Sequence, residues 1–138
     1  MRKNLTAEDL GDLTTQPLLA VLATTRPDGT VLLSPVWHEW RDGGFGVVTG
    51  TNDVKARHLR RDPRASIVIC EQTPPYRGLE VRGPARLIAA SAADCTRIAA
   101  RYLGQEGGAA YAAQAADDLM IRIEPGVLRA WDFTDSFS

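Results

Sequence analysis

The feature that most constrains this chain is a series of tight-turn signals that separate short apolar segments. Glycine, proline and aspartate cluster at residues 26–29, 42–44 and 125–126, and Gly83-Pro84 marks a bend or bulge within a longer strand. Residues 26–29 are a strong β-hairpin signal, because proline and aspartate favour the start of a turn and Gly29 accepts a positive φ. The apolar segments between these turns are short, so the pattern predicts strands that are joined by hairpins.

We expect strands at residues 18–25, 30–40, 45–49, 64–71, 79–89, 119–124 and 127–133. Pro35 interrupts the second of them and indicates a bulge or a strand edge, because proline cannot donate to a sheet ladder. Helices are expected to open at Thr6, to be capped by Asn52 and Ser91, and to reach residue 118 in an alanine-rich segment. Helices do not alternate with strands, which excludes a doubly wound sheet. The prediction is therefore a mainly β fold, an antiparallel split or closed β-barrel of six or seven strands with small helices.

The composition fits a single domain over residues 1–138. The chain is 44% hydrophobic and 24% charged, and a chain of this size buries roughly 68% of its unfolded surface. Its net charge of -1 argues against a nucleic-acid partner. Cys70 and Cys95 have no metal-ligand spacing, and Cys70 follows an apolar run that predicts a buried position. No apolar run approaches a secretion signal or a membrane span, so we expect a cytoplasmic protein without a membrane partner.

Residues 49–64 concentrate positive charge, with five lysines and arginines against two aspartates. Thr49, Gly50 and Thr51 follow an expected strand and lead into an expected helix that carries Lys55. Hydroxyl groups, a helix N-terminus and a lysine one turn into the helix can together hold an anion. A basic helix with a solvated face explains the same residues equally well.

No self-sufficient catalytic apparatus is visible in the sequence. The chain has no Gly-x-Ser-x-Gly motif, and its glycines match neither a dinucleotide-binding loop nor a Walker loop. His38 and His58 are too isolated to be a metal pair, and His38 is expected to pack or hydrogen bond within the fold. No pair of glutamates is placed to act as acid and base. No metal site and no catalytic residue are therefore nominated, and chemistry supplied by a bound cofactor is favoured.

Several short motifs occur in an order that resembles one known family. They are Arg26-Pro-Asp-Gly29, Ser34-Pro-Val-Trp37, Thr49-Gly-Thr51, Lys55-x-Arg57-x-Leu59-Arg-x-Asp-Pro63 and Gly78-Leu-Glu-Val-x-Gly83. Together they resemble the flavin/deazaflavin oxidoreductases (FDOR-B-like) of the pyridoxamine 5′-phosphate oxidase-like, FMN-binding split β-barrel superfamily, over residues 14–132. The resemblance implies a homodimer with a cofactor site at each subunit interface. It implies coenzyme F420, an 8-hydroxy-5-deazaflavin, as the cofactor, with flavin mononucleotide (FMN) as the rival.

The resemblance also assigns candidate cofactor-binding residues. It implies that Thr49, Gly50 and Thr51 donate hydrogen bonds to the cofactor phosphate and that Lys55 supplies a positive charge. Arg57 would reinforce that charge or reach the acidic tail of a deazaflavin. The strand along the cofactor ring corresponds to Ser34, Pro35, Val36 and Trp37, although Trp37 equally suits the barrel core.

The remaining positions are less directly assigned. Arg77 and Glu80, with Arg82, would close the site from the partner chain. His58 stands where many relatives carry asparagine, and Asp53 would repel a phosphate unless its side chain points away. Arg60, Arg61 and Arg64 are assigned to a solvated face or to the rim of the site.

The resemblance implies an oxidoreductase that transfers a hydride from the reduced deazaflavin coenzyme to an unsaturated small-molecule acceptor. Two alternatives stay open: an FMN-binding oxidoreductase of the pyridoxamine-phosphate-oxidase type, and a non-catalytic carrier of flavin, deazaflavin or haem. The arginines and lysines of residues 30–36 and of the C-terminus that would bind FMN are missing, which favours the deazaflavin. A nucleic-acid-binding barrel is disfavoured, because no aromatic residues are interleaved with the basic helix.

Overall fold

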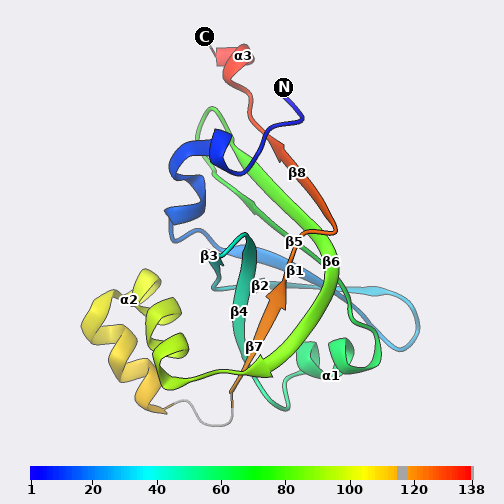
Figure 1. The fold of residues 1–138 in the computed structure, drawn as a ribbon, viewed down its shortest axis with the longest axis vertical. Helices are drawn as coiled ribbons and strands as arrows, with labels where there is room; N and C mark the ends of the chain where they lie inside the picture. The colour runs from blue at the N-terminus through cyan, green and yellow to red at the C-terminus, as the bar shows by residue number, and fades with distance from the viewer. Residues whose placement is uncertain (115–117, 138) are drawn as a thin grey trace.

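The computed structural model describes residues 1–114 and 118–137, and its strands form one strongly curved antiparallel sheet (Figure 1). Within these residues, eight strands follow the order β2-β1-β5-β6-β7-β4-β3, with β8 paired to β6. The strands are β1 (Ala20–Thr25), β2 (Val31–Val36), β3 (Glu39–Arg41), β4 (Gly44–Gly50), β5 (Arg64–Cys70), β6 (Gly78–Ala89), β7 (Asp118–Ile123) and β8 (Val127–Trp131). The helices are the 3-10 helix η1 (Glu8–Thr15), α1 (Val54–Arg61), α2 (Ala92–Gln114) and α3 (Thr134–Phe137). The antiparallel split barrel is confirmed.

The strand count exceeds the expected six or seven, because the segment expected as one strand at residues 30–40 is two. The break falls at Trp37 and His38, where the backbone N–H of His38 donates to the hydroxyl of Tyr102 at 3.0 Å instead of extending β2. Pro35 lies within β2, a terminal strand of the described sheet, which confirms the expected strand edge.

The hairpin turns predicted at residues 26–29 and 42–44 are confirmed, whereas residues 125–126 connect β7 to β8, each of which pairs with β6. In the β1–β2 turn, the N–H of Arg26 donates to the carbonyl of Thr30 at 2.8 Å, and Gly29 has a φ of +87°. In the β3–β4 turn, Asp42 and Gly43 both have positive φ, 51° and 73°. Two consecutive residues of positive φ are characteristic of a type I′ turn, whose twist matches that of the strands it joins.

The side chains of each strand alternate between the inside and the outside of the barrel, and the inward ones form one apolar core. Members that are at most 1% exposed include Leu22, Ile67, Leu79, Val81 and Ile121. Leu10 and Leu13 of η1 join this core. Alternation after Ile67 and Ile69 turns Cys70 outward, so the expectation of a buried Cys70 is wrong.

The helix starts follow local side-chain chemistry. Ser91 and Asp94 each accept a hydrogen bond from the other's backbone N–H at 3.0 Å, which is the expected capping box of α2. Thr6 and Asp9 form the same reciprocal pair, although η1 itself begins two residues later than Thr6, at Glu8. The expectation of Asn52 as the cap of α1 is wrong, because Asp53 occupies that position.

Helix α2 is two helical pieces joined at Gly104, whose φ is +78°. The helix was expected to reach residue 118, which is wrong, because Asp118 is the first residue of β7. Residues 115–117 lie outside the described residues. Among the helices that the structure describes, none combines the length and apolar character needed to cross a membrane.

A partly buried ion pair attaches α2 to the sheet. The guanidinium of Arg97 donates to both carboxylate oxygens of Glu39 at 2.7 Å and to Asp94 at 2.9 Å. Glu39 is only 8% exposed, so its charge depends on Arg97 for compensation.

We expect Glu39→Gln to lower the free energy of unfolding by about 2 kcal/mol, because Arg97 would lose its charge-assisted hydrogen bonds to Glu39 and keep only Asp94 as an ionic partner. Urea unfolding at pH 7 measures the change. Glu124→Gln is the matched control, since Glu124 pairs with Arg86 on the exposed surface, and should cost less than about 1 kcal/mol. Equal losses in the two variants would contradict the anchoring role of Glu39.

Candidate cofactor site

Thr49, Gly50 and Lys55, three of the residues predicted to form an anion cradle after β4, surround a carboxylate of the chain itself. The hydroxyl of Thr49 donates to Oδ2 of Asp53 at 2.7 Å, and the backbone N–H of Gly50 donates to the same oxygen at 3.1 Å. The ammonium group of Lys55 lies 3.9 Å from this oxygen. The hydrogen bond from Thr49 is the main cause that lowers the pKa of Asp53, and Gly50 and Lys55 add to it. Three donors therefore converge on one point and stabilise negative charge there.

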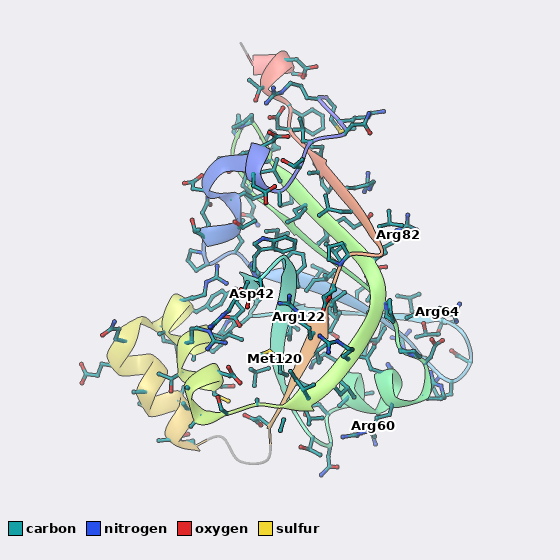
Figure 2. All side chains as sticks on the ribbon, viewed as in Figure 1. Asp42, Arg60, Arg64, Arg82, Met120 and Arg122 are labelled. Atoms are coloured by element: carbon teal, nitrogen blue, oxygen red, sulfur yellow. The ribbon has the colours of Figure 1, made fainter. Side chains whose placement is uncertain are left out.

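The three arginines of helix α1, Arg57, Arg60 and Arg61, are all exposed. Arg57 is exposed, and within the described residues its guanidinium makes neither a hydrogen bond nor an ion pair. Arg60 donates to the carbonyl of Thr51 at 2.8 Å, and Arg61 donates to the carbonyl of Thr25. Arg64 pairs with Asp62 at 2.7 Å. Figure 2 shows Arg60 on α1 and Arg64 on the outside of the barrel.

His58 lies on the inner side of α1 and joins this helix to β1. It is 6% exposed, and its Nδ1 lies 3.0 Å from the hydroxyl of Thr24. Burial lowers the pKa of His58, and the nearby guanidinium groups lower it further. Since Lys55 lies one turn before His58, this contact fixes the helix that presents the lysine.

A groove of about 580 Å³ lies on the outward face of β2, β1, β5, β6 and β8, which we call the outer face. The strand register aligns one row across it: Leu33, Ala23, Ser66, Arg82 and Val127. The groove is lined by Ala23, Thr24, Thr25, Gly29, Val31, Arg64, Ala65, Ser66, Arg82, Gly83, Pro84 and Val127. The wall includes Arg82, which the resemblance placed at the site, and Arg64, which was assigned to a solvated face or to the rim of the site. Ser66 was not predicted, although alternation within residues 64–70 marks it as outward.

Most of the predicted site residues do not line this groove. Among the described residues, Arg82 is part of its wall and the other candidates are not. Two touch wall residues: His58 contacts Thr24, and the carboxylate of Glu80 lies 3.9 Å from Arg82. Glu80 also accepts a hydrogen bond from Arg129 at 2.9 Å.

The strand expected along the cofactor ring divides its residues between the two faces of the sheet. In β2, Pro35 is exposed with Val31 and Leu33, while Ser34 is half-buried and Val36 is buried on the inner side. Leu33 is 63% exposed, so this edge of the outer face is open and apolar.

Trp37 packs against α2. Its ring stacks on Tyr102 with centroids 5.1 Å apart and an interplanar angle of 9°, and it lies 5.2 Å from the ring of Tyr111. These contacts join the end of β2 to both pieces of α2 and favour the packing role for Trp37.

Arg77 is committed to the fold of its own chain. Its guanidinium donates to Glu71 at 2.8 Å, to Asp12 at 2.7 Å and to the carbonyl of Leu10 at 2.7 Å. Hydrogen bonding to Glu71 is the main cause that raises the pKa of Arg77. The side chain thus ties η1 to the connection between β5 and β6.

His38, next to Trp37, is fully buried and lies within hydrogen-bonding distance of Tyr102. The hydroxyl of Tyr102 lies 3.0 Å from Nδ1 of His38 and 2.8 Å from the carbonyl oxygen of Leu18. Nε2 of His38 has no hydrogen-bond partner among the described residues. Burial, with a smaller effect of Arg101, lowers the pKa of His38 to about 4.

Comparison with known proteins agrees with this fold. The family model of pyridoxamine 5′-phosphate oxidase matches residues 7–132, so the chain belongs to the pyridoxamine 5′-phosphate oxidase family. No curated protein matches the sequence.

Solved structures extend the comparison. A conserved hypothetical protein from Mycobacterium tuberculosis is 26% identical, with a TM-score of 0.80 over 97% of this chain and 89% of the other. An F420 reductase is 27% identical, with a TM-score of 0.70 over 85% of this chain and 93% of the other. A FAD-binding protein from Mesorhizobium loti has a TM-score of 0.65 at 17% identity, over 94% of this chain and 97% of the other, and shares the fold.

The buried His38 predicts a pH dependence of stability. Its pKa falls from 6.5 in an unfolded chain to about 4 in the folded protein, so the unfolded state binds a proton first as the pH falls. The stabilisation is complete above pH 6.5 and is lost between pH 6.5 and about 4, at a total cost of about 3 kcal/mol. Urea unfolding of the wild type and His38→Asn across this range measures it. Between pH 6.5 and 4 the free energy of unfolding of the wild type should fall by about 3 kcal/mol more than that of the variant. Parallel curves of unfolding free energy against pH would contradict the role of buried, neutral His38.

Proposed function

We propose that this protein is an F420-dependent reductase that uses reduced deazaflavin to reduce an unsaturated small molecule. The observation that carries the proposal is the convergence of Thr49, Gly50 and Lys55 on a single anionic oxygen. The 27% identical F420 reductase supports the choice of cofactor. When bound in its reduced form, the deazaflavin supplies a hydride to the acceptor.

The chemistry of the cradle fits the phosphate group of such a cofactor. A hydroxyl, a backbone N–H and an ammonium group are all donors, and Oδ2 of Asp53 marks where a phosphate oxygen would be held. Arg57, exposed on the next turn, is available to a second anionic group of the ligand. The strand β2 would orient the ring through Pro35 and its neighbours on the outer face.

We propose that the site is completed by a second copy of this chain. Within one chain, the cradle, the outer face and the Arg77 network are held by different elements. The outer face exposes Leu33 at 63%, Val31 at 54% and Val127 at 48%, an apolar area that a partner would cover. Covering it would also exclude water from a cofactor that lies there.

An FMN-binding oxidoreductase is the second candidate, and the match of residues 7–132 to pyridoxamine 5′-phosphate oxidase supports it. The cradle suits the phosphate of either cofactor. A non-catalytic carrier of flavin, deazaflavin or haem is the third, since no acid or base is nominated. Turnover of unsaturated acceptors with reduced deazaflavin separates the first candidate from the other two.

We expect Lys55→Ala to weaken binding of the preferred cofactor by about 10- to 150-fold, because a charge-assisted contact contributes about 1.5–3 kcal/mol. The measurement is a fluorescence titration with coenzyme F420 and FMN side by side. Lys3→Ala removes the other lysine of the chain and should leave both affinities unchanged. An unchanged affinity in Lys55→Ala would refute the phosphate site.

We expect Leu33→Asp to convert a homodimer into a monomer, because a charge would be buried in the apolar part of the proposed interface. Light scattering coupled to size-exclusion chromatography at micromolar concentration reports the mass. The control is Leu103→Asp on α2, where the side chain is 47% exposed and away from the outer face. A monomeric wild type, or a dimeric Leu33→Asp, would rule out this interface.

A further inference from the structure

Asp53 brings a negative charge to the place where a ligand phosphate would lie. Its carboxylate is held by Thr49 and Gly50 through one oxygen, and its side chain is 52% exposed. Lys55, by contrast, is 20% exposed, so its ammonium group is the more firmly placed partner of the pair. The positive charge of the cradle is therefore largely offset by the chain itself.

The two candidate cofactors differ in the charge that they bring to this point. FMN ends in a phosphate monoester, which carries about -1.5 to -2 at pH 7. The phosphate of a deazaflavin coenzyme is a diester and carries a single negative charge. Coulomb repulsion by a nearby carboxylate is proportional to the ligand charge, so it penalises the monoester about twice as strongly.

On this basis, and resting on the proposed phosphate site, we propose that Asp53 is a specificity-determining residue that selects a phosphodiester over a phosphomonoester. A ligand phosphate takes over the donors Thr49 and Gly50, and the half-exposed carboxylate swings toward solvent while staying near the bound anion. A singly charged diester tolerates this neighbour. A doubly charged monoester meets one positive charge from Lys55 and one negative charge from Asp53.

The same geometry makes Asp53 an internal competitor of any ligand. Binding must replace both hydrogen bonds that the carboxylate accepts, and a phosphate replaces them because it offers several oxygens to Thr49, Gly50 and Lys55 at once. A small monoanion that offers a single contact gains nothing over Asp53. The cradle thus discriminates both against weak anions and against doubly charged ones.

Asp53→Asn tests the proposal, because asparagine keeps the shape and the accepting oxygen but loses the charge. The affinities of the wild type and the variant are measured for FMN and for coenzyme F420 by fluorescence titration. At a separation of about 5 Å with water-like screening, removing the charge should tighten FMN about 15-fold and coenzyme F420 about fourfold. The preference for the deazaflavin over FMN should therefore fall about fourfold. Asp62→Asn, at the other end of α1, is the matched control and should leave the preference unchanged.

Two outcomes separate a failure of this inference from a failure of the proposed function. If Lys55→Ala weakens both ligands while Asp53→Asn leaves their ratio unchanged, the phosphate site stands and the role of Asp53 is refuted. If Lys55→Ala changes neither affinity, the phosphate site itself is wrong and the inference falls with it. Thermal unfolding of each variant shows whether it is folded, and Asp53→Glu, which retains the charge, should keep the wild-type preference for the deazaflavin.

Discussion

The bend of β6 is the constraint on which the rest of the structure depends. Residues 78–82 of this strand pair with β8, whereas residues 85–89 pair with β7, so one strand belongs to both halves of the sheet. The change of partner occurs at Gly83, where a side chain would lie 2.5 Å from the carbonyl oxygen of Glu124. Only glycine fits this close approach of the two backbones. The N–H of Gly126 donates to the carbonyl of Arg82 at 2.9 Å and so holds the connection between β7 and β8 against β6. The expected bend at Gly83 and Pro84 is therefore a condition for the split barrel.

The two halves of the curved sheet present their outward faces to different surroundings. On the β3-β4-β7 half, α2 covers the sheet through Arg97 and Glu39 (Figure 1). On the other half, the outer face carries the groove and has no covering helix within the described residues. Helix α1 contacts both halves, because it follows β4 and is joined to β1 through His58 and Thr24. The cradle is thus built where the two halves meet.

The turns and helix caps that the sequence predicts correctly are formed by residues that lie close together in the chain. Asp42 and Gly43 form their turn through their own backbone preferences, and Ser91 caps α2 through a partner three residues away. The break at His38 was not predictable in this way, because it depends on Tyr102, which is 64 residues distant. The contact of Arg77 with Asp12, which is 65 residues away, was not predictable for the same reason.

In the candidate site, too, some features could be predicted from nearby residues and others could not. Strand and helix signals placed Thr49, Gly50 and Lys55 together, and the structure brings them to one point. The orientation of Asp53 could not be predicted, because its carboxylate accepts hydrogen bonds from Thr49 and Gly50 and makes no side-chain cap to the helix that it begins. A sequence also gives residue charge without showing which charges are already compensated.

That compensation decides what the basic segment offers a ligand. Arg64 is paired with Asp62, and the guanidinium groups of Arg60 and Arg61 are committed to backbone carbonyls. Lys55 is offset by Asp53. Hydrogen bonds to neutral carbonyls leave the charges of Arg60 and Arg61 uncompensated, so this segment of five cations and two aspartates presents a net charge of +3, carried by Arg57, Arg60 and Arg61. A polyanion such as nucleic acid needs many uncompensated cations, whereas a single phosphodiester is matched by these few charges and by the two directed donors, Thr49 and Gly50.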